Sequence, residues 1–212
     1  MKAILKEHGR PVMALNMRYF TAYEFMNHAF WWDVSRSGGP IVEQATHFVD
    51  LARYLGGEIL LPSIQTICTR PEHSAGYLST MVEGMEDGVK DDNRVPRVTN
   101  ATWRFQDGGC GSLTHAVALH GCKYDTAIDV ICDGLRMTLE DIYSQEYRLV
   151  VRRGSTDDTV EVKVPIEDTY LTELQMFIDA VRSGDDNKIT SSYEDAAKTY
   201  LATLAIRDAE RK

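Results

Sequence analysis

SGGPIVEQATHFVDLARYLGG, the stretch at residues 37–57, is punctuated like a helix. Pro40 follows two glycines, and proline suits a first helical turn because its fixed φ is already helical and its missing N–H would be unpaired there. Gly56 and Gly57 supply a left-handed stop. Apolar residues recur between these ends at steps of three and four, so the stretch predicts an amphipathic helix over residues 40–55. These apolar residues are Ile41, Ala45, Phe48, Ala52 and Leu55.

A polar stripe follows the opposite edge of the same predicted helix. At steps of four, three and four, it contains Glu43, His47, Asp50 and Tyr54. The carboxylates one turn before and one turn after His47 favour its protonated form, and such an imidazole can transfer protons near neutral pH. A histidine between acids is also common on a solvated or ion-paired helix face. Spacing alone leaves both interpretations open and favours the solvated face.

Composition limits the class of function. The chain has 212 residues, of which 43% are hydrophobic and 26% are charged, as in an ordinary globular protein. We expect a single domain over residues 1–212. The formal net charge of -9 argues against nucleic-acid and anionic-membrane partners, because both need clustered lysine and arginine.

The first residues and the cysteines indicate the compartment. Residues 1–8 are polar and lack the apolar core of a signal peptide, and no apolar stretch is long enough to span a bilayer. The cysteines contain no Cys-x-x-Cys pair, so we expect them to be reduced and mostly buried, without a disulfide or a zinc cage. They are Cys68, Cys110, Cys122 and Cys132. These features predict a cytoplasmic protein.

The order of the remaining patterns predicts an α+β fold. Strand-like runs occur at 11–19, 58–70, 98–105, 110–119, 124–132, 135–139, 147–152 and 159–164, and helical runs at 169–181 and 193–206. The strands after residue 98 are joined by short turns, which is typical of an antiparallel meander. We therefore expect a mostly antiparallel open sheet with helices packed on one face. The charged segment 71–97 is expected to be an excursion, a lid or a mobile region.

This pattern resembles the C-terminal domain of the Gfo/Idh/MocA oxidoreductases, the group of glucose–fructose oxidoreductase and inositol dehydrogenase. The opening strand at 11–19, the helix at 38–51, the hairpin around 107–109 and the closing helix from 192 carry the resemblance. The helix matches the family's Gly-Gly, acid-x-x-x-His-x-x-Asp pattern, with Glu43 where the family more often has aspartate. The resemblance implies that His47 is the general acid/base and that Glu43 orients it or contacts the substrate. Candidates for the substrate wall are Arg18, Tyr19, Trp31, Trp32 and Asp50.

The resemblance also implies a nucleotide-binding half that this sequence lacks. In the family, an N-terminal Rossmann domain binds NAD(P), and hydride passes between the nicotinamide and a sugar or polyol carbon. No Gly-x-Gly-x-x-Gly follows a strand here, and the family's Glu-Lys-Pro segment is absent. We therefore expect no cofactor bound by this chain alone, a Rossmann partner or a missing N-terminal half, and no activity in isolation.

Two other functions remain open. The chain can be a non-catalytic oligomerisation or partner-binding module, and in either case we expect a homo-oligomer through the sheet face. The aromatic density around Trp31 and Trp32 fits a subunit contact or a small core as well as a sugar pocket. A weaker alternative is a metal hydrolase built on His47, His115 and His120, although the spacing of the last two matches no common ligand motif.

Overall fold

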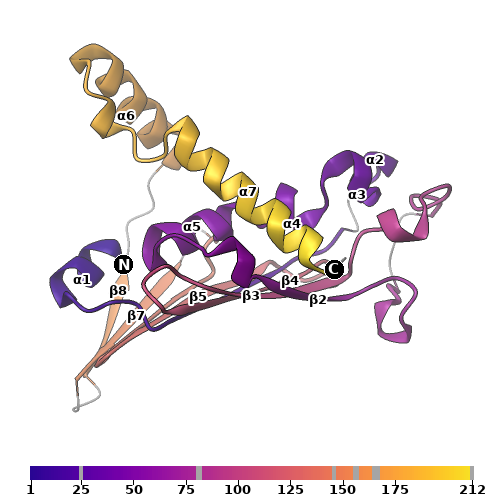
Figure 1. Cartoon of the computed structure of the whole chain (residues 1–212), viewed down its shortest axis with the longest axis horizontal. Helices are drawn as coiled ribbons and strands as arrows, with labels where there is room; N and C mark the ends of the chain where they lie inside the picture. Colours follow the sequence, from indigo (N-terminus) through magenta and orange to yellow (C-terminus); the bar gives the residue numbers. More distant parts are fainter. Residues whose placement is uncertain (24–25, 80–82, 145–146, 155–157, 164–167, 211–212) are drawn as a thin grey trace.

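One open sheet forms the base of the molecule (Figure 1). This computed structural model describes residues 1–23, 26–79, 83–144, 147–154, 158–163 and 168–210. The strands within them lie in the order β2-β3-β4-β1-β5-β6-β7-β8. They are β1 (Ala14–Phe20), β2 (Gln65–Thr69), β3 (Val98–Arg104), β4 (Cys110–Ala116), β5 (Asp125–Cys132), β6 (Leu135–Glu140), β7 (Arg148–Arg153) and β8 (Asp158–Lys163). With helices on one side, the fold is α+β and mostly antiparallel, which confirms the predicted class.

The position of β1 corrects the predicted meander. β3 and β4 form the expected hairpin, and β5 to β8 form a meander, but β1 lies between β4 and β5. It pairs in parallel with β4 and antiparallel with β5. Residues 117–124 carry the chain across the end of β1. Periodicity identifies a strand but not its neighbours, so the sequence pattern could not predict this insertion.

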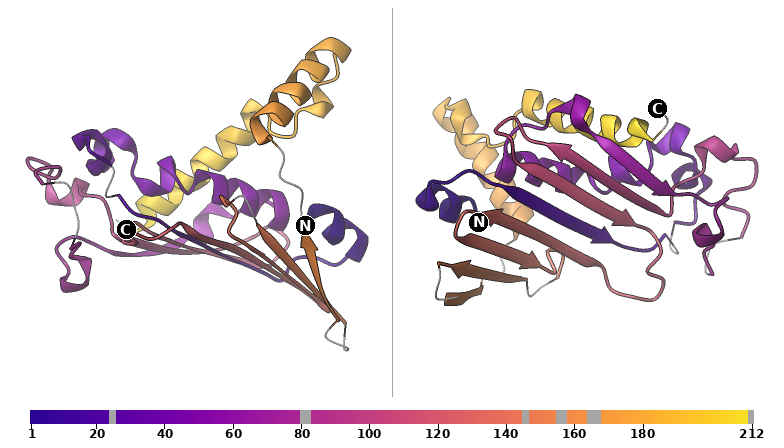
Figure 2. Two further views of the ribbon diagram at one scale, coloured as in Figure 1. Left: turned by 180° about the vertical axis from the view of Figure 1, so that it is seen from behind. Right: turned by 60° about the horizontal axis from the view of Figure 1, so that its bottom comes forward.

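The two faces of β1 have different chemistry. Leu15, Met17 and Tyr19 point into the core between sheet and helices and are at most 6% exposed. Asn16 and Arg18 alternate with them and lie on the opposite face. There Asn16 accepts a hydrogen bond from a serine of β4 at 2.8 Å, and Arg18 forms a 2.7 Å ion pair on β5. Figure 2 shows that no helix of the described chain covers this second face.

The helices lie on the core side of the sheet (Figure 1). They are α1 (Lys2–His8), α2 (Ala29–Trp32), α3 (Val34–Ser37), α4 (Pro40–Glu43), α5 (Thr46–Gly56), α6 (Thr169–Ser183) and α7 (Tyr193–Ala209). The single helix predicted over 40–55 is therefore divided into α4 and α5. None of the helices in the described ranges is long and apolar enough to cross a membrane.

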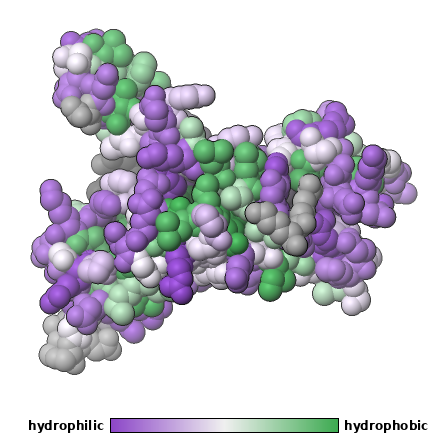
Figure 3. Space-filling model, viewed as in Figure 1, coloured by the Kyte–Doolittle hydropathy of each residue, from purple (hydrophilic) through white to green (hydrophobic). Residues whose placement is uncertain are grey.

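The two C-terminal helices behave differently. α7 packs against α4, α5 and β2, with Ala202 and Ile206 fully buried in the core. α6 extends away from the sheet, and its large apolar residues are exposed. Figure 3 shows them as green atoms along one side of the projecting lobe. The prediction that helices pack on the sheet is right for α5 and α7, whereas the large apolar side chains of α6 stay exposed.

A buried ion pair fixes the described part of segment 71–97. Arg97 donates to both carboxylate oxygens of Glu86 at 2.8 Å and to the carbonyl of Gly76 at 3.2 Å. Its guanidinium also lies 5.8 Å from the centre of the Trp32 ring. These contacts attach the segment to a second, smaller core that contains Trp32.

The cysteines are all free, as predicted, but their burial differs from the prediction. Cys132 is buried and Cys68 is half-buried, whereas Cys110 and Cys122 are exposed. Cys110 is the first residue of β4, and Cys122 lies in the connection between β4 and β5.

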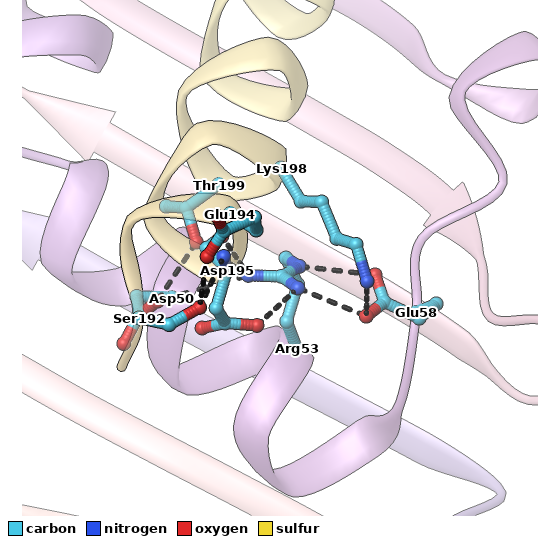
Figure 4. Close-up of polar contacts among 8 residues, drawn as sticks. All are labelled: Asp50, Arg53, Glu58, Ser192, Glu194, Asp195, Lys198 and Thr199. Carbon is cyan, nitrogen blue, oxygen red and sulfur yellow. Dashed lines mark hydrogen bonds and ion pairs between the residues drawn. The ribbon is translucent and has the colours of Figure 1, made fainter. Parts of the chain in front are cut away.

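Arg53 joins α5 to α7 and to the loop that follows α5 (Figure 4). Its side chain is only 4% exposed and lies between Glu58, at 2.9 Å, and Asp195, at 2.7 Å. It also donates to the hydroxyl of Thr199 at 2.7 Å, and that hydroxyl donates to Asp50 at 2.7 Å. Burial alone would lower the pKa of Arg53, but its hydrogen bonds to the two carboxylates outweigh burial and raise it. The guanidinium is therefore permanently charged and fully partnered.

Replacing Arg53 by methionine should weaken the docking of α7. Arg53→Met keeps the aliphatic volume but leaves Asp195 without its cation and Glu58 with only the more distant Lys198, at 3.4 Å, so we expect the free energy of unfolding to fall by about 3 kcal/mol in urea titrations at pH 7. Arg136→Met is the matched control, because Arg136 pairs with Asp129 at 2.8 Å while half-exposed, and such pairs contribute at most about 1 kcal/mol. Equal losses in the two variants would contradict a special role for Arg53.

The same pair predicts a pH dependence. The hydrogen bond from Arg53 holds the pKa of Glu58 below its usual value. A carboxyl with a lowered pKa in the folded state stabilises the fold above its unfolded pKa of about 4.3, and this contribution is lost as the pH falls further. Between about pH 5 and about pH 3, the free energy of unfolding should therefore fall more for wild type than for Arg53→Met.

Candidate active site

The candidate site begins where α4 ends. The amide of Ala45 donates to the carbonyl of Pro40, five residues earlier, at 3.0 Å, and the amides of Phe48 and Val49 both donate to the carbonyl of Ala45. This pattern inserts a wider turn between α4 and α5, and such irregular turns within helices are frequent at functional sites. The regular spacing that the sequence predicts from Glu43 to His47 is therefore interrupted at Gln44 and Ala45.

A buried histidine holds this break in place. Nε2 of His115, on β4, lies 2.9 Å from Oε1 of Gln44, and both residues are buried. An amide oxygen only accepts hydrogen bonds, so Nε2 carries the proton in this pair. Complete burial lowers the pKa of His115 to about 3, which keeps the ring neutral at physiological pH. The sheet therefore anchors the residue next to Glu43 with an uncharged hydrogen bond.

Glu43 is half-buried beside a fully buried tyrosine. The hydroxyl of Tyr23, which is 1% exposed, donates to Oε2 of Glu43 at 3.4 Å. Burial raises the pKa of Glu43, and the hydrogen bond from Tyr23 opposes this effect in part. A carboxyl with a raised pKa can exchange a proton or donate a hydrogen bond nearer to neutral pH than an exposed one.

An aromatic group adjoins Glu43. The ring of Tyr19 stacks on Phe48 with 5.2 Å between centroids, and it meets Tyr143 at 5.6 Å and Tyr124 at 6.0 Å. Burial, followed by the neighbouring tyrosines and Glu43, raises the pKa of Tyr19, so its hydroxyl stays neutral. Tyr124 and Tyr143 each expose 48% of their surface, so their rings can form one wall of an open site.

His47 and Asp50 have different surroundings. His47 lies at the start of α5 and is exposed, and none of the described residues forms a hydrogen bond or an ion pair with its ring. Asp50 lies one turn later and accepts the 2.7 Å hydrogen bond from Thr199. The structure therefore turns Asp50 toward α7 and leaves the His47 imidazole available to a molecule outside this chain.

The other predicted wall residues are not brought together. Arg18 points to the open face of the sheet and pairs with Asp125, whereas Tyr19 points to the helix side. Trp32 has no exposed surface and packs at right angles on Tyr23, and its indole N–H donates to the carbonyl of Met26 at 2.7 Å. Trp31 is half-buried at the edge of the same small core.

Sequence reasoning missed four residues of this group. Gln44 lies inside the predicted helix, and the sequence places His115 on a strand or in the weaker metal-hydrolase alternative. Tyr124 precedes β5 and Tyr143 follows β6, so both lie at the open end of the β5–β6 hairpin. Only the pairing of β1 with β5 brings them to Tyr19. The sequence signal for Gln44 is that helical spacing places this polar residue on the apolar, core-facing side of the predicted helix.

The described residues offer no metal centre. No group of three or more histidine, cysteine, aspartate or glutamate side chains is arranged among them to hold a metal ion. Of the three histidines in the metal-hydrolase alternative, His115 is buried on Gln44 while His47 is exposed, so these two lie in separate environments.

The described residues do not fit a dinucleotide either. A Rossmann site needs a glycine-rich turn between a parallel strand and the N-terminus of its crossover helix. The parallel strand β1 is followed by residues 21–28 and the four-residue α2, without a glycine. The positive-φ pair Gly38 and Gly39 precedes only the four-residue α4.

Comparison with known proteins places this domain among oxidoreductases. Residues 1–135 match the family model described as "Putative oxidoreductase C terminal domain". Over 210 residues, 99% of this chain, the sequence is 40% identical to the uncharacterized protein UNK4.17 of Schizosaccharomyces pombe, of which it covers 51%. It is 36% identical to the uncharacterized protein C12C2.04 of the same yeast and covers 53% of that protein. The chain thus spans about half the length of the curated relatives it matches.

Solved structures share the fold at low sequence identity. Levoglucosan dehydrogenase in complex with NADH and levoglucosan superposes with a TM-score of 0.70 at 18% identity, over 98% of this chain and 59% of that one. UDP-N-acetylglucosamine 3-dehydrogenase GnnA from Acidithiobacillus ferrooxidans gives a TM-score of 0.69 at 13% identity, over 99% and 57%. The structural match is to the C-terminal half of Gfo/Idh/MocA-type dehydrogenases.

Removing the charge of Glu43 should stabilise the fold near neutral pH. Because the folded-state pKa of Glu43 is raised, its ionisation opposes folding as the pH rises above about 4.3, the usual value for glutamate. We expect Glu43→Gln to have a higher free energy of unfolding than wild type at pH 7, with the difference shrinking toward pH 4. Urea titrations across this range measure it.

The control for this prediction is an exposed glutamate. Glu173→Gln on α6 removes the same charge from an exposed position and should give no pH-dependent difference from wild type. A Glu43→Gln variant that is less stable than wild type at pH 7 would contradict the assigned environment of Glu43.

Proposed function

The chain belongs to the oxidoreductase C-terminal domain family, and we propose that it is the substrate-side domain of an NAD(P)-dependent dehydrogenase acting on a sugar or polyol. The observation that carries the proposal is the pairing of a half-buried Glu43 of raised pKa with an exposed His47 across one irregular turn. Two structures of the same fold bear names of dehydrogenases with sugar-derived substrates, which supports the substrate class.

In this proposal His47 moves the proton of the reacting hydroxyl. Oxidation of an alcohol carbon requires loss of the hydroxyl proton, and an unpartnered imidazole at the surface of α5 can accept it. Glu43 is held by Tyr23 and can hydrogen-bond the same or a neighbouring hydroxyl. The half-exposed rings of Tyr124 and Tyr143 offer apolar surface to the carbon face of the sugar.

The hydride acceptor in this proposal is NAD(P) on a second half of the enzyme. The described residues of this chain do not fit the dinucleotide, and the curated relatives are about twice as long as the aligned segment. We therefore expect the chain alone to be inactive and a nucleotide-binding half to supply the cofactor. His47, Glu43 and the tyrosine wall would supply binding, orientation and proton transfer.

Reconstitution with a nucleotide-binding half tests this function. The probe is the portion of UNK4.17 that lies outside the aligned segment, mixed with this chain, NAD or NADP, and a panel of sugars and polyols. We expect turnover in the mixture, and His47→Gln should lower it by about 100-fold or more because the proton acceptor is lost. The control His8→Gln changes a partly exposed histidine on α1, whose ring contacts the carbonyl of Asp133, and should leave turnover unchanged.

Turnover that persists in His47→Gln would contradict the assignment of His47 as the proton acceptor. A mixture that binds the cofactor but oxidises no sugar or polyol would instead overturn the substrate class. Absence of turnover together with absence of cofactor binding in every mixture would favour the non-catalytic module.

We also propose a homo-oligomer through the open face of the sheet. This face carries no helix in the described chain, and it presents Ile67, which is 78% exposed, together with Arg18, Asn16 and Thr102. A broad, uncovered sheet face with mixed polar and apolar side chains suits a symmetric contact between two copies. This observation also favours the alternative function of an interaction module.

Light scattering on the purified chain tests the oligomer. We expect a mass of two or more chains for wild type and a shift toward the single chain for Ile67→Asp, since a charge at the contact is costly to desolvate. Val160→Asp, at a 58% exposed position on the edge strand β8, is the control and should keep the wild-type mass. A monomeric wild type at working concentrations would contradict this proposal.

A further inference from the structure

The apolar surface of α6 is unusual for a helix of a globular domain. Ala180 is the only residue of α6 that is buried, whereas the large apolar side chains along the helix are between 40% and 78% exposed. They are Tyr170, Leu171, Leu174, Met176, Phe177, Ile178 and Val181. Contiguous exposed apolar patches of this kind mark interaction surfaces. Figure 3 shows the patch as a green side of the projecting lobe, with hydrophilic residues on the other side.

The patch adjoins a concave surface. α6, the 3-10 turn Asp186–Lys188 and the first turn of α7 enclose a groove of about 890 Å³. Its apolar lining includes Leu174, Phe177, Ile189 and Tyr193. A groove beside an apolar helix stripe can receive a helix or a loop of another folded unit. The α6 surface, defined as this stripe and this groove, is therefore shaped for a macromolecular partner.

We propose that the α6 surface is the seat of the nucleotide-binding half of the enzyme. This inference rests on the proposed function, because it assumes that such a half exists. The chain spans 51% and 53% of two curated relatives, so about half of each relative lies outside the aligned segment. Because the matched family is described as a C-terminal domain, we expect the nucleotide-binding half in that remainder.

The position of the first residue points the same way. Figures 1 and 2 place the N-terminus and α1 at the end of the sheet from which α6 rises, in every view. A segment joined to Met1 would therefore start beside α6. It would also lie on the helix-covered side of the sheet, where His47 is exposed, and away from the open face.

The alternative occupant is a second copy of this chain, and the geometry favours it less. A copy seated on α6 would bring no dinucleotide site to His47, because the described residues form none. A nucleotide-binding half seated there would lie on the same side of the molecule as His47. The open sheet face remains free for contacts between copies.

Binding measurements separate these occupants. The probe is the portion of UNK4.17 that lies outside the aligned segment. It is titrated into this chain by calorimetry, and the complex is followed by hydrogen exchange. We expect a 1:1 complex in which the amides of residues 169–183 gain protection. Leu174→Asp and Phe177→Asp should each raise Kd by about tenfold or more, because each places a charge in an apolar contact. Circular dichroism should show unchanged helix content, since both side chains are exposed.

The control and the contrary outcomes are specific. Ile67→Asp, on the open face, should leave Kd unchanged. An unchanged Kd in both α6 variants would overturn the proposed seat, and so would a self-associated wild type that these two variants convert to a monomer. Binding through α6 without dehydrogenase turnover would support the docking site and contradict the proposed function. Turnover with an unaffected Kd in the α6 variants would support the function and contradict the docking site.

Discussion

The buried guanidinium of Arg53 is the interaction on which the arrangement of this domain depends. It lies on the helix that carries His47, and its hydrogen bonds reach the loop after α5 and the first turn of α7. A buried cation is costly unless every donor is partnered, so the three elements are held in one relative position. That position also sets the direction in which α6 leaves the domain, because only residues 184–192 separate α6 from α7.

A second constraint acts at the helix break before α5. The neutral His115 ties Gln44 to the centre of the sheet, so the chain between α4 and α5 cannot relax into a regular helix without losing a buried hydrogen bond. The neighbouring Glu43 is thereby kept half-buried against Tyr23, while His47 stays outside. The site thus combines a carboxyl in a fixed, partly dry environment with an imidazole that is free to meet a substrate.

The two faces of the sheet and the α6 lobe divide the surface by chemistry. The helix side carries the candidate site and the apolar α6 surface, whereas the open face carries ion pairs such as that of Arg18 with Asp125. An apolar helix stripe that is exposed in this domain is explained if another folded unit covers it. The roughly twofold length of the curated relatives is consistent with such a unit.

The sequence by itself determined the α+β class, most strands and helices, the C-terminal helix with its Ser192 cap, and the family through its Gly-Gly and His47 motif. These features depend on local periodicity, turn chemistry and residue type, which act over a few neighbouring positions. Only the tertiary structure decided that β1 enters between β4 and β5, that the central helix breaks at Gln44, and that Tyr124 and Tyr143 meet Tyr19. Those outcomes follow from strand pairing and from the partnering of buried polar groups, and both join residues that are far apart in the chain.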